Sequence, residues 1–146
     1  MPWVLAAAAG ISLAGCAHFV ILNDPLSAAE HNDLGVAYEN RGESDLARRE
    51  YRAAIRRDRR LVRAHVNLGN LEASRGRWRA AEERYRGALR LAPDDADALN
   101  NLAIALLRRG HELDEATRCA ERAVALGGAR DSIYRATLAE VRAGRH

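Results

Sequence analysis

The sequence has no lysine, one phenylalanine and two cysteines among its 146 residues. Two cysteines exclude a disulfide-dense scaffold, and no Cys/His cluster has the spacing of a zinc site. A Gly-rich phosphate loop, an HExxH motif and a GxSxG motif are also missing, so the familiar enzyme classes find no support. We therefore expect no catalytic residue, no metal, no cofactor and no small-molecule substrate.

Arginine supplies all 23 basic side chains, against 20 acidic ones, and apolar residues make up 48% of the chain. This balance is typical of a folded globular protein, and the length suits one domain of about 100–150 residues. Alanine, leucine and arginine dominate the composition and favour packed helices. The net charge of only +3 shows no strong overall bias towards partners of one sign.

The first 23 residues contain no Asp, Glu or Arg and form a separate unit. Their apolar core at 3–13 has the length of a secretory h-region, shorter than the roughly 20 residues that span a bilayer. It leads to the quartet LAGC at 13–16, which resembles a bacterial lipobox. The resemblance implies that 1–15 are a lipoprotein signal peptide, that Cys16 becomes an acylated N-terminus, and that 16–26 form an anchor and linker.

An uncleaved membrane helix over 3–22 is the alternative, and both interpretations place the rest of the chain at a membrane. Ala17, directly after the lipidated position, does not resemble an inner-membrane retention signal. We therefore expect a lipid-anchored protein of the cell envelope, on the outer membrane and facing the periplasm. A lipidated Cys16 would leave Cys119 as a free, buried thiol.

The remainder of the chain repeats with a period of 34 residues. The repeated positions are Leu34, Leu68 and Leu102; Gly42, Gly76 and Gly110; Ala47 and Ala81; Tyr51 and Tyr85; and Ala54 and Ala88. One extra residue after Gly110 restores the alignment in the third unit. This period is typical of an array of helix–turn–helix repeats.

With Leu68, Gly69, Ala81, Tyr85, Ala88 and Pro93 in its second unit, the chain resembles tetratricopeptide repeat (TPR) proteins over roughly residues 28–129. The resemblance implies an all-α fold, an α-solenoid whose three TPR helix-turn-helix repeats occupy 27–129. The units would be about 28–61, 62–95 and 96–129. A C-terminal capping helix and tail would follow at 130–146, because an open end of the stack needs a cover.

The local patterns predict helices at 27–41, 44–57, 61–75, 78–91, 95–109, 113–126 and 131–143. Ser27 and Glu30 form a capping-box pattern, and Asp94 and Asp131 are candidate caps of later helices. Glycine in mid-helix at Gly35 and Gly69 costs about 1 kcal/mol relative to alanine, which predicts that a second helix crosses closely there.

The TPR resemblance implies that a concave groove, lined by the first helix of each pair, binds a protein or peptide partner. The candidate groove residues are Asn32, Asp33, Arg63, Asn67, Asn70, Asp97, Asn100, Asn101 and Arg108. Asparagine amides donate and accept, so a spaced row can bind the backbone of an extended peptide, as in the asparagine ladders of TPR grooves. The alternative is that these asparagines only cap neighbouring backbone. The mixture of acidic and basic residues predicts no clamp for a C-terminal carboxylate.

A run of arginines is expected on the outer face of the second predicted helix. The candidates for a patch that binds anionic lipid are Arg48, Arg49, Arg52, Arg56 and Arg59. Guanidinium groups pair bidentately with phosphate, beside the expected lipid anchor. The alternative is a solvated convex face in an arginine-rich protein. Nucleic acid is not expected, because the lipobox resemblance implies export and Tyr51, the one aromatic residue among these arginines, is in phase with the apolar packing residues.

His31 and His65 are also 34 residues apart, and we expect them to fill packing positions rather than to bind a metal. The leading hypothesis is therefore a lipid-anchored, non-catalytic TPR adaptor or scaffold at the bacterial cell envelope. One alternative is an envelope-complex assembly factor that uses its convex arginine-rich face. Another is an accessory partner of an exported cysteine-peptidase system, because residues 20–38 resemble the junction before TPRs in some bacterial papain-like peptidases.

Overall fold

The computed structural model describes residues 24–144, and every regular element in this part of the chain is an α-helix. The helices are α1 (Ala28–Asn40), α2 (Ser44–Arg57), α3 (Val62–Ser74), α4 (Trp78–Leu91), α5 (Ala96–Arg109), α6 (Leu113–Leu126) and α7 (Asp131–Ala143). All seven expected helices are present, with each end within one residue of its predicted position. In this part of the chain, no helix has the length and apolar character needed to cross a bilayer.

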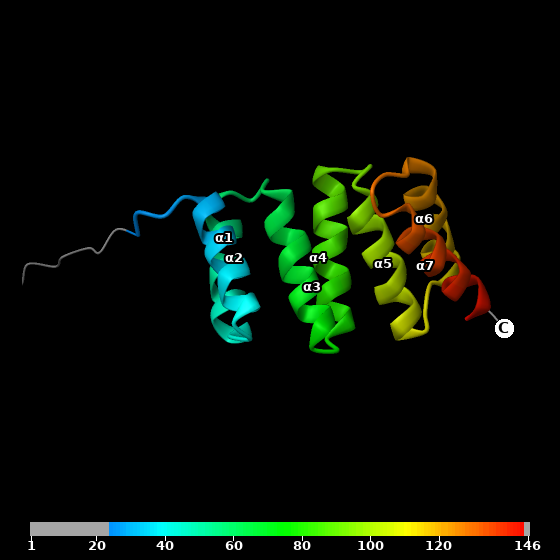
Figure 1. Cartoon of the computed structure of the whole chain (residues 1–146), viewed down its shortest axis with the longest axis horizontal. Coiled ribbons are helices and arrows are strands. Elements are labelled where there is room, and N and C mark those ends of the chain that lie inside the picture. Colours follow the sequence, from blue (N-terminus) through cyan, green and yellow to red (C-terminus); the bar gives the residue numbers. More distant parts are fainter. Residues whose placement is uncertain (1–23, 145–146) are drawn as a thin grey trace, which may run out of the picture.

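The helices form three hairpins, α1–α2, α3–α4 and α5–α6, which follow one another along the long axis of the molecule (Figure 1). The first helices of successive hairpins, α1, α3 and α5, contact one another. Within residues 24–144, the second helices α2, α4 and α6 do not contact one another and pack only on first helices and, for α6, on α7. The first helices therefore line the inner wall of the stack. Helix α7 packs on α5 and α6 and covers the C-terminal end. The predicted all-α solenoid with a capping helix is confirmed.

Side-chain caps fix the starts of two helices. Ser27 and Glu30 complete the predicted capping box at α1. At α5 the cap is Asp95, whose carboxylate accepts from the Ala98 N–H at 2.8 Å, and not Asp94 as predicted. Asp94 is turned away and pairs with Arg122.

The prediction for Asp131 also needs correction. Asp131 is the first residue of α7 and pairs with Arg135 one turn later, while Arg130 holds the N-cap position. An acid in the first turn still interacts favourably with the helix dipole, so the same residue type serves a neighbouring position.

Left-handed glycines end the first helix of each hairpin. Gly42, Gly76 and Gly110 have φ of +76°, +70° and +67°, which residues with a Cβ rarely adopt. The inserted residue predicted after Gly110 lies in the α5–α6 turn, where Glu112 has φ +52°. It is the one non-glycine residue with positive φ in the described part of the chain.

The mid-helix glycines make room for tyrosine rings. A Cβ on Gly35 would lie 2.5 Å from Cε1 of Tyr51, and one on Gly69 would lie 2.5 Å from Cε1 of Tyr85. Both tyrosines are buried on the second helix of the same hairpin. The close helix crossing was therefore predicted correctly, but an aromatic ring rather than a helix backbone occupies the space.

Candidate binding groove

Asparagine side chains link the first helices along the inner wall. The Asn67 amide on α3 donates to Oδ1 of Asn32 on α1 at 2.9 Å. One hairpin further on, the Asn101 amide on α5 donates to Oδ1 of Asn70 on α3, also at 2.9 Å. The predicted row exists, and part of its hydrogen-bonding capacity joins neighbouring repeats.

Two members of the predicted row do not face solvent. Asn32 and Asn100 are only 2% and 3% exposed, because both lie on the seam between helices. Asn32 also donates to Asp33, and Asn100 donates to Asn101 at 3.3 Å. The prediction that these two amides contact a ligand is therefore wrong. Asn70 is exposed, and Asn67 and Asn101 are partly exposed.

The charged residues predicted for the groove are already paired within the chain. Arg63 lies 3.6 Å from Asp33, and Arg108 on α5 lies 3.0 Å from Glu140 on α7. Asp97 is held by α7, where it accepts from the Tyr134 hydroxyl at 2.9 Å and lies 3.1 Å from Arg130. Burial and this hydrogen bond raise the pKa of Tyr134, which therefore stays a donor at neutral pH. The groove offers no unpaired cation at these positions.

A hollow of about 250 Å³ opens on the inner wall between the second and third hairpins. It is lined by Asn70, Ala73, Ser74, Trp78, Tyr85, Asn101 and Ile104. The Tyr85 hydroxyl donates to Oδ1 of Asn70 at 2.9 Å, and burial raises the pKa of Tyr85, so the hydroxyl remains protonated. The hollow thus combines an apolar lining with amide groups at its rim.

Most of the lining of this hollow was missed by sequence reasoning, although a signal was present. Ala73 occupies the position of Glu39 in the first hairpin, and Trp78 occupies that of Ser44. In the first hairpin the Tyr51 hydroxyl donates to Glu39 at 2.6 Å instead. Departures from the 34-residue pattern, rather than the pattern itself, mark the hollow.

The predicted arginine patch is smaller than expected. Arg48 is half-buried and lies 3.1 Å from the buried Glu72 on α3, so the prediction that it faces a lipid surface is wrong. Arg49, Arg52, Arg56 and Arg59 are exposed, as predicted.

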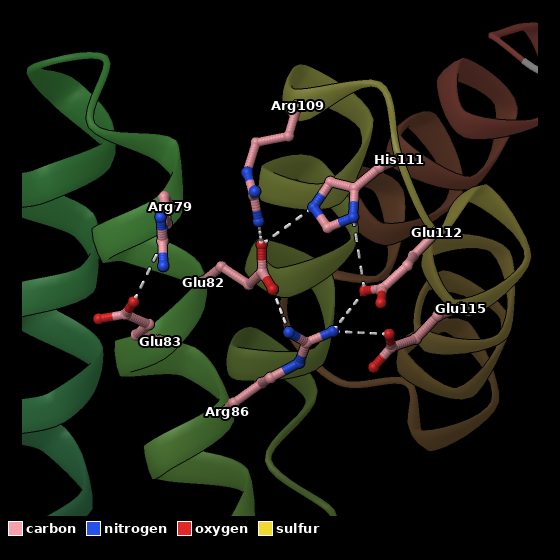
Figure 2. Close-up of polar contacts among 8 residues, drawn as sticks. All are labelled: Arg79, Glu82, Glu83, Arg86, Arg109, His111, Glu112 and Glu115. Carbon is pink, nitrogen blue, oxygen red and sulfur yellow. Dashed lines mark hydrogen bonds and ion pairs between the residues drawn. The ribbon is translucent and has the colours of Figure 1, made fainter.

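An ion-pair cluster joins α4 to the α5–α6 turn (Figure 2). The carboxylate of Glu82, 5% exposed, contacts Arg86 and Arg109, and one of its oxygens lies 3.3 Å from Nε2 of His111. Arg86 also contacts Glu112 at 2.6 Å and Glu115 at 2.7 Å. The hydrogen bond from Arg86 holds the pKa of Glu112 below its usual value.

Three residues of this cluster have metal-ligating groups. One ligand atom from each of Glu82, His111 and Glu112 lies within 4.8 Å of the others. Arg86 and Arg109 occupy the same Glu82 carboxylate, so a cation would have to displace two guanidinium groups. We interpret the cluster as an ionic connection between the second and third hairpins.

The remaining candidates have structural surroundings. His31 is buried, with Nδ1 2.7 Å from Glu50, whereas His65 is half-buried and its Nε2 lies 3.1 Å from the Arg59 carbonyl. Cys119 is free but half-buried rather than buried, and burial raises the pKa of its thiol. A raised thiol pKa disfavours a nucleophilic role. Cys16 and the predicted signal peptide lie outside the described residues.

Comparisons with known proteins agree with this architecture. A family model described as tetratricopeptide repeat matches residues 32–78, and a second, described as TPR repeat, matches residues 69–110. The fold is similar to a solved structure of the first TPR of Spaghetti (RPAP3) bound to the HSP90 peptide SRMEEVD. That similarity has a TM-score of 0.76 and 19% identity, and covers 86% of this chain and 98% of the other. No curated protein matches the chain.

Proposed function

Because this chain belongs to the tetratricopeptide repeat family, we propose that it is a non-catalytic adaptor that binds an extended peptide segment of a protein partner. The observation that best supports this proposal is the hollow between the second and third hairpins, with amides at its rim. Neither matching family model describes an enzyme family. The similar RPAP3 structure is a peptide complex, which supports the same use of the inner wall here.

The chemistry of the hollow favours an uncharged segment that carries one large apolar side chain. Trp78, Ala73 and Ile104 offer apolar surface, and the exposed Asn70 amide can donate to a peptide carbonyl. The peptide in the RPAP3 complex contains three acidic residues. Here the groove residues Arg63 and Arg108 are engaged by Asp33 and Glu140, so we propose that an acidic terminus is not the preferred ligand.

Replacing Ile104 with aspartate should weaken this binding. A carboxylate in the hollow would have to be desolvated against the incoming apolar side chain, which we expect to weaken binding at least about tenfold. The measurement is selection of a random peptide library on the purified full chain, followed by titration of an enriched peptide. Ile133→Asp is the matched control, because Ile133 is apolar and 52% exposed on α7, outside the hollow. Enrichment of acidic C-terminal peptides, or equal binding by both variants, would contradict the proposal.

We further propose that the adaptor is lipid-anchored through Cys16 at the bacterial cell envelope, on the outer membrane and facing the periplasm. The lipobox-like quartet at 13–16 supports this placement. More than one acyl chain gives lasting attachment, because each buried methylene contributes about 0.8 kcal/mol.

Metabolic labelling with a fatty acid tests the anchor. Wild-type protein expressed in a bacterium should incorporate the label and sediment with the membrane fraction, and Cys16→Ser should lose the label. Cys119→Ser is the matched control, since it removes the other cysteine and should label as wild type. Label that persists in Cys16→Ser would show that Cys16 is not the acylated residue.

A further inference from the structure

We propose that the exposed arginine face of α2, defined here as Arg49, Arg52 and Arg56, docks on a phospholipid surface with anionic head groups. The inference rests on the proposed anchor at Cys16 for where the protein meets a membrane. The surface itself is defined by described residues alone.

The three arginines form one stripe on α2. They are spaced i, i+3 and i+7 and lie opposite the buried Ala47 and Tyr51, which pack into the stack. Within residues 24–144 none of the three has an ion pair or a side-chain hydrogen bond. Exposed, unpaired guanidinium groups are free to bind phosphate, and their planar fork allows bidentate contacts.

The next hairpin shows how such an arginine is neutralised when it serves the fold. Arg86 occupies on α4 the position of Arg52 on α2, and it contacts Glu112 and Glu115. The residues of the second hairpin that correspond to Glu112 and Glu115 are Arg77 and Ala80. Neither has a carboxylate that could pair with Arg52. The positive charge of this face is therefore left for an external partner.

A hollow of about 290 Å³ lies at the base of this face, between its arginines and the Asp24–His31 contact. His31 is 3% exposed, and its Nδ1 is engaged by Glu50 at 2.7 Å. Nε2 lies 2.9 Å from Asp24 but is not aligned for a hydrogen bond, and it has no hydrogen-bond partner. The carboxylates of Asp24 and Glu50 also line this hollow and engage the His31 ring, so a head-group phosphate would contact the guanidinium groups on the arginine side of the hollow.

The path of the chain favours a membrane over an acidic protein as the occupant. Arg57 on α2 donates to the backbone carbonyl of Asp24, so the N-terminal segment enters the fold beside the arginine face. Cys16 precedes Asp24 by eight residues, which span at most about 29 Å. An acylated Cys16 would thus hold this face near head groups. The face points away from α1 and α3, so docking would leave the inner wall open to a partner.

Vesicle co-sedimentation tests the docking surface without the acyl chains. The protein is the full chain carrying Cys16→Ser, and the probes are vesicles of phosphatidylcholine with and without phosphatidylglycerol. The neutral vesicles measure any binding by the apolar N-terminal residues. At low salt, Arg49→Gln/Arg52→Gln/Arg56→Gln should bind the anionic vesicles about 100-fold more weakly, since each arginine near such a surface contributes about 1 kcal/mol. Binding to neutral vesicles should not change.

Arg84→Gln/Arg90→Gln/Arg118→Gln is the matched control. It removes the same charge from arginines on α4 and α6 that also lack ion pairs among residues 24–144. We expect it to weaken binding less than about fivefold. Equal losses in the two triple variants would overturn the inference and indicate a net-charge effect. Polyglutamate serves as a probe for an acidic protein partner. If the α2 variant bound anionic vesicles as wild type does but lost binding to polyglutamate, the inference would also be overturned, and an acidic protein would be the partner. Fatty-acid labelling of Cys16 would still succeed in either case, so failure of the docking surface is distinguishable from failure of the anchor.

Discussion

Replacing Gly69 with alanine is expected to lower the free energy of unfolding by about 1–3 kcal/mol, the usual cost of overpacking. Alanine is the better helix former by about 1 kcal/mol, so propensity alone predicts the opposite sign. The added Cβ would lie 2.5 Å from Cε1 and 2.9 Å from Cδ1 of Tyr85. Tyr85 is 2% exposed and packs in one core cluster with Leu102 and Leu106, so a shift of its ring would disturb these contacts. Urea denaturation followed by circular dichroism measures the change.

A double-mutant cycle isolates the contact. Tyr85→Ala alone should cost about 3–5 kcal/mol, because it leaves a cavity in the core. In that background Gly69→Ala should stabilise the protein, since the ring that forbade a Cβ is gone. The control Gly87→Ala places its Cβ 3.2 Å from the His65 side chain, a milder contact that should cost less. Additive effects of Gly69→Ala and Tyr85→Ala would show that the ring does not explain the glycine.

The third hairpin supports this account from within the chain. There the glycine position holds Ala103 and the tyrosine position holds Ala120, and both side chains are buried. Where the ring is absent, the glycine is absent too. The 34-residue register was therefore sufficient to predict the helices and this pairing, because both follow from residues that recur at equivalent positions.

The 34-residue repeat did not predict which side chains are buried by a neighbouring helix. Arg48 and Arg49 are neighbours, yet α3 presents Glu72 to Arg48 and leaves Arg49 exposed. Likewise Asn100 is buried while the adjacent Asn101 is partly exposed, because a step of one residue turns about 100° around the helix. The orientation of each helix towards its neighbours is a tertiary property that a single-helix pattern does not contain.

The hollow and the ion-pair cluster escaped prediction for a different reason. Both arise where one hairpin departs from the others: Ala73 and Trp78 open the hollow, and the inserted residue in the α5–α6 turn accompanies His111 and Glu112. Aligning the repeats identifies the residues that they share and not those that differ between them. The differing residues that form the hollow and the ion-pair cluster lie in the second and third hairpins, where the proposed peptide site also lies.

Replacing Glu82 with glutamine is expected to lower the free energy of unfolding by about 2 kcal/mol. The change keeps the shape of the side chain but leaves Arg86, Arg109 and His111 without their shared carboxylate. Removing one partner of a fully buried ion pair costs about 3–5 kcal/mol. The side chains of Arg86 and Arg109 are 35% and 30% exposed, so water screens part of that loss. Urea denaturation at low and high salt measures the effect.

Glu83→Gln is the matched control on the next residue. Among residues 24–144, Glu83 pairs only with the exposed Arg79, at 3.6 Å, and exposed pairs contribute about 0–1 kcal/mol. Most of the Glu82 effect should persist at high salt, because its carboxylate is shielded from mobile ions. If Glu82→Gln and Glu83→Gln lowered the free energy of unfolding by equally small amounts, the cluster would not contribute to the stability of the fold. If Glu82→Gln alone is costly, the inserted turn is held to α4 by this carboxylate, and the hairpins that enclose the hollow are fixed relative to one another.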